Sequence, residues 1–242
     1  MEKWGIIGAM EEEISLLTAA MENLTTRTVA GRLYYEGSIE GHPVAVTRCG
    51  VGKVFSAMAT QVLIDCFGVT RLINIGVAGG VGVGLHVGDM VLSTDAVQHD
   101  FDLSPLGCVR GHNSDLGGDP AKPTRYVADE GLRERFKAAA QKTLPADGGL
   151  LEGTIASGDQ FIDSAATKEL LRERFGAVAC EMEGAAMAQV AACQNVPFLI
   201  VRSISDMADG GAQISYREMV QVAADRATTA LLCMLRDLPA EG

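Results

Sequence analysis

Short apolar runs alternate along the chain with segments in which apolar residues recur at helical spacing. Residues 3–9 form the first run and predict a buried strand, and a helical pattern that includes Ile14 and Leu17 follows directly. Strand-like segments at 31–39 and 44–49 come next, before a predicted helix at about 55–66. The order β-α-β-β-α is typical of an α/β protein.

The alternation of strands and helices continues to the end of the chain. Strands are predicted at residues 71–75, 90–97, 149–156 and 197–204, and helices at 126–141, at 164–175, from the acidic stretch near 181 through 190, and at 215–235. The glycine-rich residues 76–84 read as a turn, and residues 98–123 as a long irregular segment. Irregular segments of this length in compact domains are usually binding loops, lids or contacts to a partner.

Two carboxylates one residue apart, Glu181 and Glu183, lie in a segment that is otherwise almost entirely small or apolar. An ionised carboxylate in such surroundings needs a hydrogen bond or a charged partner, or it takes up a proton. The pair therefore indicates either a functional site or a buried ion pair. If a helix begins here, the two side chains point about 200° apart, and at most one faces a given pocket.

Two other acids follow predicted strands. Glu13 comes after the first strand, in a cluster of three acids that also suits a helix N-terminus, and Asp206 comes at the end of the strand at 197–204. Ligands of open α/β sheets bind beyond the carboxyl ends of the strands. Carboxylates without a metal or nucleophile signature suit acid/base cleavage of a bond whose transition state carries positive charge, such as a glycosidic bond. The residues alone do not select the substrate.

Length and composition fit one large α/β domain. Of the 242 residues, 48% are hydrophobic, which is enough to bury a sizeable core. A formal net charge of −11 provides no basic surface for nucleic acid or an anionic membrane, so neither is expected as a partner. The six cysteines form no CxxC pair, and no apolar run approaches the roughly 20 residues of a membrane span. We therefore expect a soluble cytoplasmic protein with reduced thiols.

Three further features could indicate a binding site, but the residues around each of them favour another interpretation. The glycine-rich residues 76–84 precede a turn and a strand, whereas a dinucleotide site needs a helix there. Histidine and acid meet at His99-Asp100, but the four histidines show no metal-ligand spacing, so no metal is expected. Phe161, just past a strand end, suits either the core or a stacking surface for a flat ligand, and by itself the core is favoured.

Seven ordered blocks of residues span nearly the whole chain and resemble a known family. They are Gly5 to Glu13 (GIIGAMEEE), Gly50 to Lys53 (GVGK), the glycine turn from Asn74 to Gly80, His99-Asp100, Ser157 to Asp159 (SGD), Glu181 to Glu183 (EME), and Arg202 with Ser205-Asp206. The first block and the last two are the most specific. The chain resembles the bacterial 5′-methylthioadenosine/S-adenosylhomocysteine nucleosidases, within the nucleoside phosphorylase superfamily.

The resemblance implies a fold and a reaction. The fold would be a single domain over residues 1–242, with three α/β/α layers around a central mixed, twisted sheet. The reaction would be hydrolysis of the N-glycosidic bond of 5′-methylthioadenosine and S-adenosylhomocysteine to adenine plus 5-methylthioribose or S-ribosylhomocysteine. No metal or organic cofactor would be needed, and the enzyme would be a homodimer.

The resemblance also implies a role for each matched residue. Glu13 would position and deprotonate the attacking water, and Asp206, held by Ser205, would protonate N7 of adenine. Glu183 would accept hydrogen bonds from the ribose hydroxyls, where its charge favours an oxocarbenium-like transition state. Around the substrate, Met182 would lie against the sugar, Phe161 would stack on adenine and Ile162 would contact the base edge. Arg202 would lie behind the water and ribose, and Glu181 would be a supporting residue that Arg202 could hold. The remaining matches are Val77, Ala78 and Gly79 in the glycine turn, Met10, Val51 and Tyr216 around the 5′-thio group, and Leu103 and Leu106 from the partner subunit.

The chain departs from the family at three positions. Val77 stands where many members have Ser, Tyr216 where Phe is common, and Leu106 where an aromatic residue is common. The loss of Ser at position 77 removes or replaces one polar contact near the water. The departures concern mainly the pocket for the 5′ substituent, so they bear on substrate preference more than on the reaction.

Three alternatives remain open at the level of the sequence. A nucleoside phosphorylase of the same superfamily would need cationic partners for phosphate, which a carboxylate at Glu13 would repel. An aminodeoxyfutalosine hydrolase would use the same machinery on another substrate. A non-catalytic nucleotide-binding domain would leave Glu13, Glu183 and Asp206 unexplained as a set.

Overall fold

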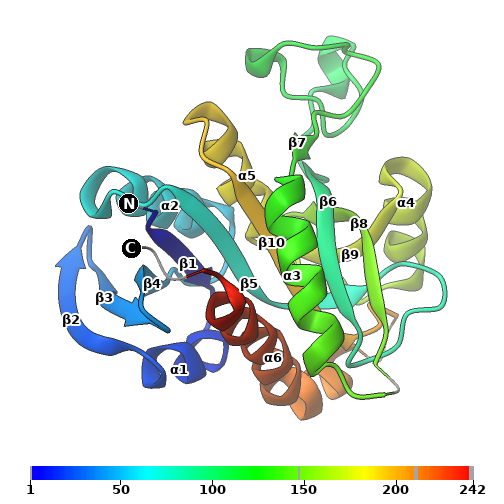
Figure 1. Cartoon of the computed structure of the whole chain (residues 1–242). Helices are drawn as coiled ribbons and strands as arrows, with labels where there is room; N and C mark the ends of the chain where they lie inside the picture. The colour runs from blue at the N-terminus through cyan, green and yellow to red at the C-terminus, as the bar shows by residue number, and fades with distance from the viewer. Residues whose placement is uncertain (1, 147, 210–211, 240–242) are drawn as a thin grey trace.

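The structure, a computed structural model, describes residues 2–146, 148–209 and 212–239 (Figure 1). Its elements follow one another as β1 (Trp4–Gly8), α1 (Glu11–Ala19), β2 (Glu22–Val29), β3 (Arg32–Ile39), β4 (His42–Arg48), α2 (Lys53–Phe67), β5 (Arg71–Gly80), β6 (Met90–Gln98), η1 (Ser104–Leu106), η2 (Ser114–Leu116), β7 (Tyr126–Val127), α3 (Glu130–Thr143), β8 (Leu150–Ser157), α4 (Ala165–Phe175), β9 (Ala177–Glu181), α5 (Gly184–Cys193), β10 (Phe198–Asp206) and α6 (Ala212–Asp237).

The strands of the described chain form one mixed sheet in the order β10-β6-β8-β9-β5-β1-β4-β3-β2, with β7 paired to β6. Strand β10 also pairs with β5, so β5, β10, β6, β8 and β9 close into a ring. On its other side β5 pairs in parallel with β1 as far as Asn74, and antiparallel with β9 at Gly79 and Gly80. The sheet therefore forks along β5, and residues 75–78 face an opening between β1 and β9.

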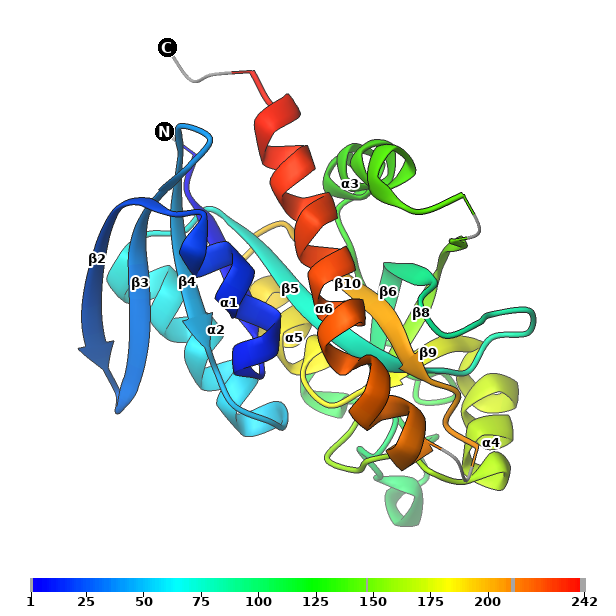
Figure 2. The ribbon, with the colours of Figure 1, turned by 90° about the horizontal axis from the view of Figure 1, so that it is seen from below.

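Helices cover both faces of the sheet. Helices α1 and α3 pack against α6 on one face, while α2 and α5 pack together on the opposite face (Figures 1 and 2). Helix α4 packs against β8 and β9 at the end of the sheet far from β2. The predicted α/β/α layering around a mixed sheet is confirmed. No helix in the described ranges is long and apolar enough to cross a membrane.

Continuous apolar runs explain why the central strands are buried on both faces. Every residue of β1 and of β10 is buried, as expected for strands that have helices on both sides. Local signals set the helix ends: Gly68, with φ of 65°, ends α2, and the Asp129 side chain accepts a hydrogen bond from the Leu132 N–H at the start of α3. At these strands and helix ends, the local sequence favours the structure that the packing also requires.

The structure corrects several predicted boundaries. The predicted glycine turn is strand as far as Gly80, because β5 continues along β10. Strand β2, which was not predicted, has almost no buried residue and pairs with β3 as an exposed hairpin. The helix predicted from residue 126 begins at Glu130, after the short strand β7, and the last helix begins at Ala212 instead of 215.

Candidate active site

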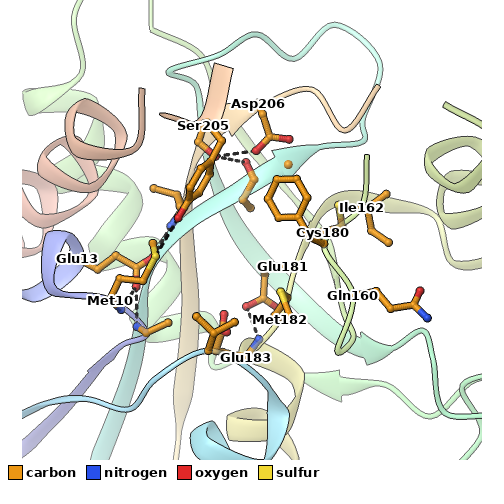
Figure 3. A pocket seen from close by; sticks show the side chains of 17 residues that line it. Met10, Glu13, Gln160, Ile162, Cys180, Glu181, Met182, Glu183, Ser205 and Asp206 are labelled. Carbon is orange, nitrogen blue, oxygen red and sulfur yellow. Dashed lines mark hydrogen bonds between the residues drawn. The ribbon is translucent and has the colours of Figure 1, made fainter. Parts of the chain in front are cut away.

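A cavity of about 380 Å³ lies where β5 exchanges its neighbour β1 for β9 (Figure 3). A change of strand neighbours leaves a crevice at the carboxyl ends of the strands, the usual ligand position in such sheets. Of the predicted site residues, the structure brings the following to this cavity: Glu13, Asp206, Glu183, Met182, Phe161, Ile162, Ser205, Met10, Val51, Val77, Ala78, Gly79, Glu181 and Tyr216.

Glu13 is held against the fork in the sheet. Its carboxylate accepts hydrogen bonds from the N–H groups of Ala9 (2.6 Å) and Met10 (3.0 Å) on one oxygen, and from Val77 (3.0 Å) on the other. Burial raises the pKa of Glu13, although the charge of Arg202 and these three donors act in the opposite direction. A buried carboxylate with a raised pKa, fixed in one orientation, is suited to accept a proton.

Asp206 ends β10 on another side of the cavity (Figure 3). The hydroxyl of Ser205 donates to its Oδ2 at 2.9 Å, and the N–H of Ala208 donates to Oδ1 at 3.0 Å. Burial raises the pKa of Asp206, and the charges of Asp163 and Asp209 add to that effect. Because its pKa is raised, a larger fraction of Asp206 is protonated near neutral pH than of an ordinary aspartate, and this suits a proton donor.

Glu183 directly precedes α5, but its carboxylate points to a different helix. The N–H of Gly52, at the start of α2, donates to its Oε1 at 2.8 Å, and the Ser56 hydroxyl donates to its backbone carbonyl at 2.9 Å. The N-terminus of α2 therefore favours the negative charge of Glu183. Burial and the nearby charge of Glu181 act the other way and raise the pKa of Glu183.

Glu181 satisfies the N-terminus of α5. Its Oε2 accepts from the N–H groups of Glu183 (3.0 Å) and Gly184 (2.7 Å), and the Ser157 hydroxyl donates to its Oε1. Arg202 forms an ion pair with the same carboxylate at 2.5 Å, with both side chains 2% exposed. The contact predicted between Glu181 and Arg202 is confirmed.

The structure decides two points that the residues alone left open. Both Glu181 and Glu183 line the cavity, because the first lies in a strand and the helix begins only at Gly184. Phe161 does not belong to the core: 49% of it is exposed, and it lines the cavity.

Aromatic and thioether groups form one side of the cavity. The rings of Phe161 and Tyr216 meet edge to face, with centroids 5.8 Å apart and planes at 83°. The Tyr216 hydroxyl donates to Sδ of Met10 at 2.9 Å (Figure 3). This side offers apolar aromatic and thioether surface with one polar group, as a nucleoside with an apolar substituent requires.

Three predicted site residues do not line the cavity of this chain. Arg202 lies behind it and donates to the carbonyl of Asn74 at 3.0 Å. Leu103 and Leu106 lie on the irregular segment after β6, and Leu106 is 78% exposed. The assignment of both leucines to the site of a neighbouring subunit stays a prediction.

Sequence reasoning missed Ala9, Gln160 and Cys180, which also line the cavity. Ala9 contributes its backbone N–H, for which no side-chain signal exists. Gln160 and Cys180 directly precede Phe161 and Glu181, so their proximity to predicted residues was the available signal.

A model of the phosphorylase superfamily matches residues 3–236 of the chain. The 5′-methylthioadenosine/S-adenosylhomocysteine nucleosidase of Halalkalibacterium halodurans is 39% identical over 237 residues, which cover 97% of this chain and 98% of that protein. The chain belongs to the 5′-methylthioadenosine/S-adenosylhomocysteine nucleosidase family of the phosphorylase superfamily. The resemblance seen in its seven sequence blocks is thereby confirmed.

Solved structures extend the similarity to the fold. The nucleosidase of this family from Neisseria meningitidis, in complex with methylthio-immucillin-A, matches with a TM-score of 0.90 and 36% identity. That match covers 98% of this chain and 100% of the Neisseria chain. The futalosine hydrolase of Helicobacter pylori matches with a TM-score of 0.88 and 34% identity, over 98% of both chains. Proteins whose names indicate different nucleosides thus share this fold.

Proposed function

We propose that the protein hydrolyses the N-glycosidic bond of 5′-methylthioadenosine and S-adenosylhomocysteine. The charge of the cavity carries this proposal. Four carboxylates line it, those of Glu13, Glu181, Glu183 and Asp206, and no lysine or arginine is found among the described residues that do so. Such a lining favours a positively charged transition state and a neutral nucleophile.

In the proposed reaction, a water molecule beside Glu13 attacks the anomeric carbon and gives a proton to that carboxylate. The bond from this carbon to N9 breaks, its electron pair passes to the base, and Asp206 donates a proton to N7. The Glu183 carboxylate binds the ribose hydroxyls and stabilises the developing oxocarbenium charge. Phe161 offers its ring to the adenine, and Met10, Val51 and Tyr216 surround the apolar 5′ group.

The lining also argues against phosphorolysis by this site. Phosphate recognition needs cationic or multiple N–H donors, and Arg is the usual choice. Arg48 lies outside the cavity lining and pairs with Glu11 at 3.8 Å, while Arg71 stands at the far end of β5. The N–H groups that point into the fork, from Ala9, Met10 and Val77, already hold Glu13. Water is therefore the nucleophile that this site accommodates.

The decisive assay measures adenine release from 5′-methylthioadenosine by enzyme that has been freed of phosphate, with and without added inorganic phosphate. We expect equal rates and a free thioribose product. A rate that depends on phosphate and yields a ribose 1-phosphate would refute hydrolysis. The same assay with S-adenosylhomocysteine and aminodeoxyfutalosine ranks the substrates, and a strong preference for aminodeoxyfutalosine would replace the proposed substrates with that nucleoside.

We also propose a cytoplasmic homodimer. All six cysteines are free thiols, as a reducing compartment favours. Large apolar side chains are exposed beside the cavity at Val51 (50%), Val54 (77%) and Phe55 (41%), and Leu106 is exposed on the segment after β6. A second copy that covers this surface would bring Leu103 and Leu106 to the 5′ side of the site. Sedimentation equilibrium at catalytic concentrations measures the mass, and a monomer with full activity would contradict the proposal.

A further inference from the structure

Arg32 lies beside the cavity without belonging to its lining. Its guanidinium lies over the ring of Phe55, with Cζ 4.0 Å from the ring centroid. Both terminal nitrogens also approach Gly50: a Cβ added at this residue would lie 3.3 Å from each of them. Gly50 has φ of 91°, a conformation that favours glycine, so the backbone here leaves room for the guanidinium.

Gly50 connects Arg32 to the mouth of the cavity. The next residue, Val51, lines the cavity and is 50% exposed, so it lies at the rim. The residue after it, Gly52, holds the Glu183 carboxylate that is proposed to bind the ribose. The Arg32 guanidinium, which approaches Gly50, therefore lies one residue away from the rim that a 5′ substituent extending along Met10 and Val51 would pass.

The positive charge of Arg32 has no acidic partner in the described part of the chain, in contrast to its neighbour. Arg48, at the end of the adjacent strand β4, lies 3.8 Å from the Glu11 carboxylate. No hydrogen bond from the guanidinium of Arg32 is found in the described part of the chain, so its N–H groups remain available beside the Phe55 ring. A planar group held in this way is suited to bind a carboxylate with two parallel hydrogen bonds, and little side-chain entropy remains to be lost.

We propose that Arg32 is a specificity-determining residue that binds a carboxylate carried by the 5′ substituent of the nucleoside. The corresponding substrate class is a 5′-thioadenosine whose thioether ends in an amino acid, as in S-adenosylhomocysteine. A short neutral 5′-methylthio group ends at the apolar rim and does not reach Arg32. This inference rests on the proposed function, and it predicts that the two substrates depend differently on a single side chain.

The test compares wild type and Arg32→Gln on three substrates: S-adenosylhomocysteine, 5′-methylthioadenosine, and 5′-butylthio-5′-deoxyadenosine, which has an extended but uncharged tail. For S-adenosylhomocysteine we expect kcat/KM to fall about tenfold, between the effects of an exposed ion pair and of a charged hydrogen bond. For the two uncharged tails kcat/KM should stay within about twofold. Rising salt should lower kcat/KM for S-adenosylhomocysteine in wild type but have little effect in the variant.

Matched variants separate charge from packing. Arg48→Gln removes a charge of the same kind from the adjacent strand, and it should leave all three substrates unchanged. Arg32→Lys should retain part of the preference for the charged tail. Equal losses on the butylthio and homocysteine tails would show that Arg32 acts by packing, and an unchanged rate with S-adenosylhomocysteine would also overturn the proposal. Turnover of 5′-methylthioadenosine by wild type tests the proposed function separately, whatever the result for Arg32.

Discussion

Gly76→Ala is the sharpest test of the position of Glu13. A Cβ at residue 76 would lie 2.3 Å from Oε1 and 2.8 Å from the carboxyl carbon of Glu13. The first distance is about 1.1 Å short of an ordinary contact of 3.4 Å, so either the carboxylate or β5 must move by that amount. The change adds one methyl group and removes no hydrogen-bonding side chain.

The carboxylate cannot simply turn away. Three backbone N–H groups hold Glu13 through both of its carboxylate oxygens, and a rotation of the carboxylate would break these hydrogen bonds. A displacement of about 1 Å at a reacting group can cost roughly 100-fold in rate, or about 2.7 kcal/mol. We therefore expect kcat/KM for 5′-methylthioadenosine to fall by about two orders of magnitude. The melting temperature should fall as well, because an alanine that the native site cannot accept without strain destabilises the fold by more than the entropy that it removes from the unfolded chain, so kcat/KM is compared per folded molecule.

Gly153→Ala is the matched control within another strand. A Cβ there would lie 2.7 Å from a methyl group of Val178, which does not line the cavity. We expect this variant to lose stability and to keep its activity per folded molecule. Adenine release and thermal unfolding are measured on both variants. Wild-type kcat/KM in a folded Gly76→Ala protein would refute the argument that the position of the Glu13 carboxylate controls the reaction.

Two further predictions concern the other acids. Asp206→Asn removes the proposed proton donor while keeping its size, so kcat should fall about 10²–10⁴-fold, whereas Asp209→Asn, the same change on an exposed neighbour, should stay within about twofold. Glu183→Gln should stabilise the empty protein at neutral pH, because burial raises the pKa of Glu183 and wild type loses stability as pH rises through that value. The gain in melting temperature should shrink as pH falls toward the ordinary range of glutamate. A pH-independent gain would contradict this reasoning.

Apolar periodicity was sufficient to predict the elements that carry a core face. Strands β1 and β10 and helix α2 have such faces, and the predicted segments overlap them closely. Strand β2 has almost none, because it is stabilised by pairing with β3 and not by burial, and its sequence gives no signal of that pairing. The prediction of a turn from Gly76 to Gly80 was wrong for a different reason. Its glycines were interpreted as turn formers, but Gly76 and Gly79 make room in a strand for Glu13 and Asp206.

In the candidate site, too, only some of the residues could be predicted from the sequence. Its acids could be found from the sequence, because carboxylates at strand ends and in apolar stretches are unusual there. Their hydrogen-bond donors could not, since most are backbone N–H groups of residues such as Ala9 and Gly52, which any side chain could carry. Arg32 shows the same limit for a side chain. Nothing in the sequence predicts that its guanidinium lies over Phe55, because the two residues come from a strand and a helix that are not neighbours in the chain.

The two glutamates that are one residue apart show how the fold separates two charges. Glu181 ends a strand and neutralises Arg202 while it satisfies the start of α5. Glu183 turns to the start of α2, where the Gly52 N–H holds it at the cavity. Two helix N-termini and one arginine therefore stabilise the negative charges of these two carboxylates, and each acid has a different set of donors. Because Arg202 is already committed to Glu181, the negative charge of Glu183 remains available to a sugar that develops positive charge.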